Sequence, residues 1–122
     1  MSFEGIETGH WGEELACEYL RKRGLKIVAR NVRTPLGEID CVAQCGRELY
    51  FVEVKTRTSS ETGRAIEQIP WHKQQRLIRL AQFYIRTHDV MRLYPHIAVV
   101  AIDGTYDRHT IEFIPDAVEC GM

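Results

Sequence analysis

Three charged residues, Asp40, Glu53 and Lys55, have the types and spacing needed for metal-ion and proton-transfer chemistry. Two carboxylates held side by side repel each other, so their proximity favours a neutralising cation. A hard ion such as Mg²⁺ takes oxygen ligands from one or two carboxylates and keeps positions for water and substrate phosphate. A lysine on the same strand face could orient or deprotonate an attacking water. Together these residues indicate a divalent-metal site.

A hairpin would bring the three residues together. Segments 37–43 and 49–56 alternate in polarity and carry β-branched and aromatic residues, as strands do. Gly46-Arg47 between them fits a two-residue type II′ turn, which sets the register. The opposed pairs in this register, with Cβ atoms about 5 Å apart, are Asp40 with Glu53 and Glu38 with Lys55.

A structural role for Lys55 is the alternative. The lysine would then neutralise Glu53 or Glu38 in a surface ladder, since edge strands are often blunted by charges. A one-residue slip would also separate the charges onto opposite faces. The acid placed opposite Glu53, with apolar residues on the other face, favours the metal site.

The pattern Asp-x(12)-Glu-x-Lys resembles the motif of the PD-(D/E)xK nucleases, the restriction-endonuclease-like superfamily that includes archaeal Holliday junction resolvases. Nearly the whole chain is similar to the small bacterial YraN proteins, the UPF0102 family. The residues that carry this likeness are Gly9 to Ala16, Tyr19-Leu20, Arg30-Asn31, Gly37 to Asp40, Phe51 to Arg57 and Lys73-Gln74. The resemblance implies a restriction endonuclease-like α/β/α sandwich with a central mixed five-stranded sheet. It also implies a homodimer, because a four-way junction needs two matched cuts.

The chain departs from the family pattern in one place. Relatives commonly carry an Arg-Phe-Asp-like triplet before the last hairpin, where this chain has His96-Ile97-Ala98. If that Asp supports the site or a subunit contact, Ala98 changes activity or assembly.

Resolvases supply another acid from their N-terminal helix, and Glu13 and Glu14 are the candidates here. At about 100° per residue, Glu13 lies at the edge of the apolar arc and can lean toward Asp40, whereas Glu14 points to solvent. The alternative for Glu13 is an ordinary acid favoured by the helix dipole. The arc consists of Trp11, Leu15, Ala16, Tyr19 and Leu20.

Residues 1–122 are expected to form a single domain, because the chain is too short for two cores. The expected order of the elements is helix, three strands, helix and two strands. The expected ranges are a helix over 9–23, a strand over 25–33, the hairpin, a polar loop over 57–63, a helix over 70–87, and strands over 97–102 and 111–114. On the second helix, a core side of Leu77, Ile78, Ala81, Tyr84 and Ile85 opposes Arg76, Arg79 and Arg86.

Basic charge is concentrated in the middle of the chain. The net charge is −1, but residues 21–86 carry 14 Lys or Arg against 6 Asp or Glu. Such a surplus attracts phosphate backbones, whereas the alternative is a solvated helix end. The expected nucleic-acid contacts are Arg30, Arg33, Arg57, Lys73 and Gln74, with Glu38 beside the metal ligands. Trp71 is open to three roles: core, base stacking or partner contact.

Other classes of protein find little support. The longest apolar run, 97–102, is too short to cross a bilayer, and no signal peptide is evident, so we expect a cytoplasmic protein. The cysteines, which form no CxxC pair, are expected to be reduced and packed as small hydrophobes: Cys17, Cys41, Cys45 and Cys120.

Three functions follow from these observations. The leading one is a nuclease that hydrolyses DNA phosphodiesters, in structured or branched DNA, with DNA favoured over RNA. Asp40 and Glu53 would hold Mg²⁺ or Mn²⁺, Glu13 would complete the metal shell, and Lys55 would orient the water. The second is a nucleic-acid-binding module of the same fold that no longer cuts. The third is a dimeric protein-interaction adaptor.

Overall fold

The computed structural model describes residues 4–57 and 69–118. Segments with alternating polarity and β-branched residues form its five strands, and two amphipathic segments form its helices. The chain order of helix, three strands, helix and two strands is the expected one. The elements are α1 (Glu4–Lys22), β1 (Lys26–Thr34), β2 (Gly37–Cys45), β3 (Glu48–Arg57), α2 (Trp71–Thr87), β4 (Tyr94–Gly104) and β5 (His109–Val118). Most of the polar loop expected over 57–63 lies outside the described residues, as does Cys120.

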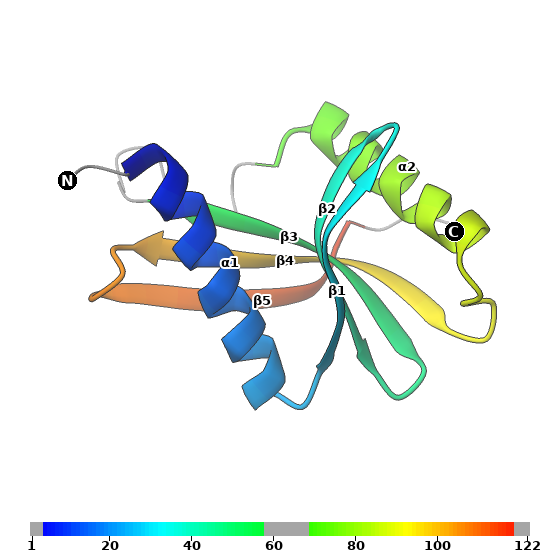
Figure 1. Cartoon of the computed structure of the whole chain (residues 1–122), viewed down its shortest axis with the longest axis horizontal. Coiled ribbons are helices and arrows are strands. Elements are labelled where there is room, and N and C mark those ends of the chain that lie inside the picture. The colour runs from blue at the N-terminus through cyan, green and yellow to red at the C-terminus, as the bar shows by residue number, and fades with distance from the viewer. Residues whose placement is uncertain (1–3, 58–68, 119–122) are drawn as a thin grey trace.

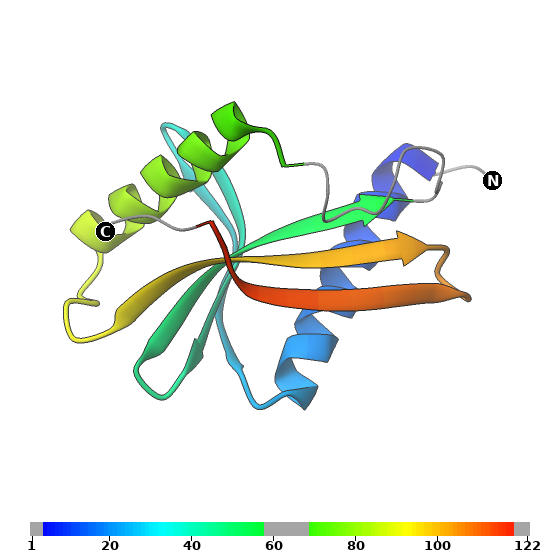
Figure 2. The same ribbon diagram turned by 180° about the vertical axis from the view of Figure 1, so that it is seen from behind.

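The strands form one mixed sheet in the order β1-β2-β3-β4-β5, in which only β3 and β4 pair in parallel. A parallel pair needs a crossover, and α2 supplies it. Helix α1 crosses in front of the sheet in Figure 1 and behind it in Figure 2, whereas α2 covers the other face. The predicted α/β/α sandwich with a mixed five-stranded sheet is therefore confirmed.

Each helix packs on its own hydrophobic cluster. The α1-face cluster consists of Ala16, Cys17, Leu20, Leu25, Cys41, Ala43, Val52, Ala98, Val100 and Ile102. The α2-face cluster consists of Ile39, Val42, Leu49, Phe51, Leu77, Leu80, Ala81, Tyr84, Ile97 and Val118. The buried part of β4 is continuous from Ile97 to Ile102, as the apolar run predicted.

Helix α1 lies close to β3 because one of its residues has no side chain. A Cβ built on Gly12 would collide with the hydroxyl of Thr56. The helix starts earlier than predicted, at Glu4, and ends before Gly24, which has the positive φ of 90° typical of a helix C-terminus.

Helix α2 lies against the hairpin formed by β1 and β2. Pro70 is its N-cap, and Leu77, Ala81 and Tyr84 are buried as predicted. Leu80, which the apolar pattern did not single out, is buried as well, and a Cβ on Gly37 would lie 3.6 Å from its side chain. The start of β2 therefore lies close to α2.

The hairpin between β2 and β3 has the predicted register along five pairs, from Cys45 with Glu48 to Cys41 with Val52. Gly46 has a φ of 59° and Arg47 has no positive φ, as a type II′ turn requires. The ladder ends at Cys41, so Asp40 with Glu53 and Glu38 with Lys55 are not cross-strand pairs. Beyond this point β2 stays paired with β1, and the two bend away from β3 toward α2 (Figure 1).

The described cysteines are free thiols. Cys17 and Cys41 are buried in the α1-face cluster, as expected for small hydrophobes. Cys45 is exposed beside the hairpin turn, so that prediction was wrong for this residue. Within residues 4–57 and 69–118, neither helix is long and apolar enough to span a membrane.

Candidate active site

Asp40 occupies the point where β2 separates from β3. Its Oδ2 accepts a hydrogen bond from the backbone N–H of Val54 at 2.8 Å. Because the ladder has already ended at Cys41 and Val52, this N–H has lost its place in the strand pairing, and the carboxylate takes it. The side chain is thereby anchored to β3 although its own strand bends away.

The surroundings of Asp40 disfavour its negative charge. Burial, together with the charge of Glu53, raises the pKa of the Asp40 carboxyl from 3.8 to about 7, and Glu13 and Glu38 add to the shift. The hydrogen bond from Val54 acts in the opposite direction but is the weaker effect. Four carboxylates from α1, β2 and β3 thus meet in one region, an arrangement that a cation would stabilise.

Glu53 has a cationic neighbour in the helix above it. The Nζ atom of Lys73 lies 3.0 Å from Oε1 of Glu53. The Lys73 side chain is only 22% exposed and the Glu53 side chain only 12%. Lys55 follows Glu53 by two residues on β3, so both point to the α2 face. Asp40 and Glu53 thus lie within electrostatic reach of each other near the end of β3 that also carries Lys55, although by a different geometry from the predicted pairing.

Glu13 and Glu14 have different environments. Glu13 lies within electrostatic reach of Asp40, whereas Glu14 is half-exposed and pairs with Arg30 at 2.8 Å. The positions agree with the helical wheel, which placed Glu13 toward the sheet.

Asn31 is a residue of this region to which the sequence reasoning gave no role. With its nitrogen turned toward the acids, its amide donates to Glu13 Oε1 at 3.1 Å and to Glu38 Oε1 at 2.9 Å. Its φ is 51°, an unusual value in a strand. Asn is depleted in strands, so its presence inside the β1 segment was an available signal.

The predicted nucleic-acid contacts differ in exposure and partners. Arg33 is 90% exposed, with Glu38 4.0 Å away. Arg30 and Lys73 pair with Glu14 and Glu53, Gln74 donates to the carbonyl of Ile69 at 3.0 Å, and Arg57 is half-buried at the end of β3. Trp71 is 72% exposed at the start of α2, which excludes a core role.

Ala98 lies on the α1 face of the sheet. It is fully buried in the α1-face cluster next to Val52, its partner in the parallel ladder. Glu53 follows Val52 and points to the α2 face. An Asp at this position would therefore lie on the opposite face from Glu53.

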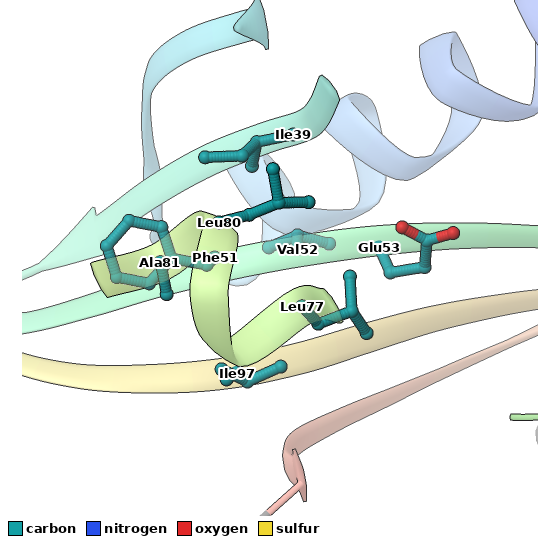
Figure 3. A pocket seen from close by; sticks show the side chains of 8 residues that line it. All are labelled: Ile39, Phe51, Val52, Glu53, Leu77, Leu80, Ala81 and Ile97. Atoms are coloured by element: carbon teal, nitrogen blue, oxygen red, sulfur yellow. The ribbon is translucent and has the colours of Figure 1, made fainter. Parts of the chain in front are cut away.

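A small cavity under α2 reaches Glu53. It measures about 10 Å³, near the volume that a single water requires, and Figure 3 shows the Glu53 carboxylate at its margin, turned away from the apolar side chains. The lining is Ile39, Phe51, Val52, Glu53, Leu77, Leu80, Ala81 and Ile97. This gap is too small for a substrate.

The donor set suits a hard cation. Across 4–57 and 69–118, no three His, Cys, Asp or Glu side chains converge as a metal site in their present positions. Mg²⁺, however, needs only one or two carboxylates, with water and substrate as its other ligands. The oxygen-only chemistry of Asp40 and Glu53, and the unfavourable charge that surrounds Asp40, fit such an ion.

Comparison with known proteins identifies the family. The model of the "Uncharacterised protein family UPF0102" matches residues 12–102. The chain belongs to the UPF0102 family. A UPF0102 protein of Syntrophotalea carbinolica is 40% identical over 119 residues, covering 98% of this chain and 97% of its own. Another, from Roseiflexus castenholzii, is 43% identical over 122 residues and covers 98% of each chain.

A solved structure also aligns with this chain. It is Pyrococcus furiosus SfsA in complex with Ca²⁺, at 14% identity and a TM-score of 0.48. The alignment covers 86% of this chain and 62% of that one.

Proposed function

We propose that this protein is a metal-dependent nuclease that hydrolyses DNA phosphodiesters. The observation that carries the proposal is the position of Asp40, which is anchored by Val54 at the separation of two strands, beside Glu53 and within the field of Glu13 and Glu38. Holding like charges together costs stability. Such an arrangement is typical of sites that bind a cation or transfer a proton. A site of this composition is suited to phosphate chemistry.

Each residue has a part in the proposed reaction. Asp40 and Glu53 would hold Mg²⁺ or Mn²⁺, and Glu13 would complete or adjust the ligand shell. The ion would supply charge stabilisation for the phosphate and lower the pKa of a bound water. Lys55 would orient the attacking water, since it shares the α2 face with Glu53. Lys73 keeps Glu53 in place while no cation is present.

The surroundings suit a DNA backbone. The first turn of α2 contains no acidic residue, and it carries His72 and Lys73, of which Lys73 pairs with Glu53. Backbone N–H groups at a helix start favour a phosphate. Arg33, exposed on β1, extends the basic surface. We infer a structured or branched DNA substrate, a cytoplasmic site of action, and a homodimer for paired cuts.

Cleavage of labelled linear, single-stranded and four-way-junction DNA tests this proposal, with Mg²⁺, Mn²⁺ or chelator. The native protein should give metal-dependent products, and Asp40→Asn should give none. Asp89→Asn, which changes an exposed acid in the α2–β4 connection, is the matched control and should cut normally. Metal-dependent cleavage by Asp40→Asn would refute the assignment.

A binding module that does not cut is the second candidate. The ion pair between Lys73 and Glu53 favours it, because this pair already neutralises one of the proposed metal ligands. Salt-sensitive binding without products, unchanged in Glu53→Gln, would support the module. If the protein neither binds nor cleaves DNA, the adaptor is the favoured function.

A further inference from the structure

Asn31 links the two acids that flank Asp40 from different elements. It lies on β1 between the pairs Arg30 with Cys41 and Val32 with Ile39, so it stands across from Asp40 in the antiparallel register. Its amide nitrogen reaches Glu13 on α1 and Glu38 on β2. The opposite orientation of the amide would place its oxygen against carboxylate oxygens, which only accept hydrogen bonds.

The chemistry of this link distinguishes it from an ion pair. One NH₂ group has two hydrogens, one for each carboxylate, and carries no charge. Lys in its place would neutralise an acid, and Asp would add another. Asn therefore fixes the positions of two carboxylates while their negative charge stays available to a cation.

The backbone at Asn31 is unusual as well. Among the described residues other than glycine, it alone has a positive φ, 51°. Strain of this kind persists where the surrounding structure imposes it, and it clusters at functional sites. Asn tolerates this conformation better than most residues, but Gly tolerates it better still. A need for positive φ alone therefore does not explain the amide.

We propose that Asn31 is a positioning residue that holds Glu13 and Glu38 around the metal site at Asp40. The inference rests on the proposed function, since Glu13 is one of its candidate ligands. A bridging amide of this kind sets the direction of a ligand without touching the ion, and the loss of such partners typically weakens metal binding 10- to 100-fold.

Two substitutions separate the amide from the backbone. Asn31→Gly removes the amide and suits the positive φ, whereas Asn31→Ala removes the amide and retains the strain. Mn²⁺ binding by calorimetry should weaken about tenfold or more in both. Thermal unfolding without metal should be near native for Asn31→Gly and lower for Asn31→Ala. Asn31→Gly that binds Mn²⁺ as the native protein does would overturn the proposal.

A matched control comes from the same two elements. Glu14→Gln removes an ion pair between α1 and β1, the one with Arg30, and should leave Mn²⁺ affinity unchanged. An equal loss of affinity in Glu14→Gln would show that any loosening of α1 has the same effect, and would also overturn the proposal.

Crystal structures without metal separate this inference from the proposed function. In Asn31→Gly, the Glu13 and Glu38 carboxylates should move apart, because no common donor holds them. If the native protein binds no Mn²⁺, the metal-dependent function fails, and these structures still decide whether Asn31 positions the two acids. Unmoved carboxylates would contradict its role.

Discussion

The carboxylate of Asp40 accepts a hydrogen bond from the Val54 N–H, 2.8 Å away, directly after the β2–β3 ladder ends. The bond replaces a backbone pairing that the bend of β2 has removed. It holds an acid near other acids, in a position that its own strand would not provide. A stabilised position for an unfavourable charge is typical of a functional site.

Asp40→Asn should stabilise the protein while abolishing metal binding. Burial and Glu53 raise the Asp40 pKa from 3.8 to about 7, so the folded protein keeps a proton that the unfolded chain releases. Stability attributable to this group therefore falls as pH rises from about 4 to 7. At pH 8 the free energy of unfolding of the variant should exceed that of the native protein by at most about 4 kcal/mol. At pH 3 the two free energies should be equal. Urea unfolding at both pH values measures this, and an equal gain at both would contradict it.

Lys73→Met should weaken the fold but strengthen Mn²⁺ binding. Its Nζ lies 3.0 Å from Glu53 Oε1, and both side chains are mostly buried, so Glu53 would lose its cation. Without metal, the free energy of unfolding should fall by about 1–3 kcal/mol. Mn²⁺ should bind severalfold more tightly, because the ammonium group that competes for Glu53 is gone. Chemical unfolding and calorimetry give the two values. Arg79→Met, an exposed change on the same helix, is the control. Unchanged or weaker Mn²⁺ binding in Lys73→Met would argue against competition.

His96 should make stability depend on pH. Its Nε2 lies 2.8 Å from Glu48 and its Nδ1 lies 2.7 Å from Asp116, and both ring nitrogens can donate only in the protonated ring. Burial lowers its pKa, but the bonds to Asp116 and Glu48 outweigh burial and raise the pKa above 6.5. The stabilisation is complete below pH 6.5 and is lost as pH rises through the folded pKa.

The difference in unfolding free energy between the native protein and His96→Gln isolates this effect, because other titrating groups cancel. It should be largest near pH 6 and shrink at alkaline pH. A difference that stays constant across this range would show that folding does not raise the pKa of His96.

Gly12→Ala should destabilise the protein although Ala favours a helix by about 1 kcal/mol over Gly. The added methyl group would meet the Thr56 hydroxyl and press α1 away from β3. Overpacking of this kind costs about 1–3 kcal/mol, and Glu13 would move with the helix. Thermal unfolding of Gly12→Ala should show the loss, which should shrink in the Thr56→Ala background. Equal losses in both backgrounds would exclude the collision.

Local pattern was sufficient for much of the molecule. Strand alternation and Gly46-Arg47 determined the register of β2 and β3, because a two-residue turn leaves one way to pair the flanking residues. The apolar arc of α1 likewise placed Glu13 toward the sheet and Glu14 toward solvent. Both conclusions depend only on neighbours within one element or one turn.

The sequence alone therefore determined the elements, their order, and the closeness of Asp40 and Glu53 near one end of a hairpin. How these residues meet depends on contacts between elements. The end of the ladder at Cys41, the hydrogen bond from Val54, the reach of Lys73 to Glu53 and the bridge at Asn31 all depend on how β2 bends over α2. That bend arises from packing between residues far apart in the chain, such as Gly37 and Leu80, and no local periodicity encodes it.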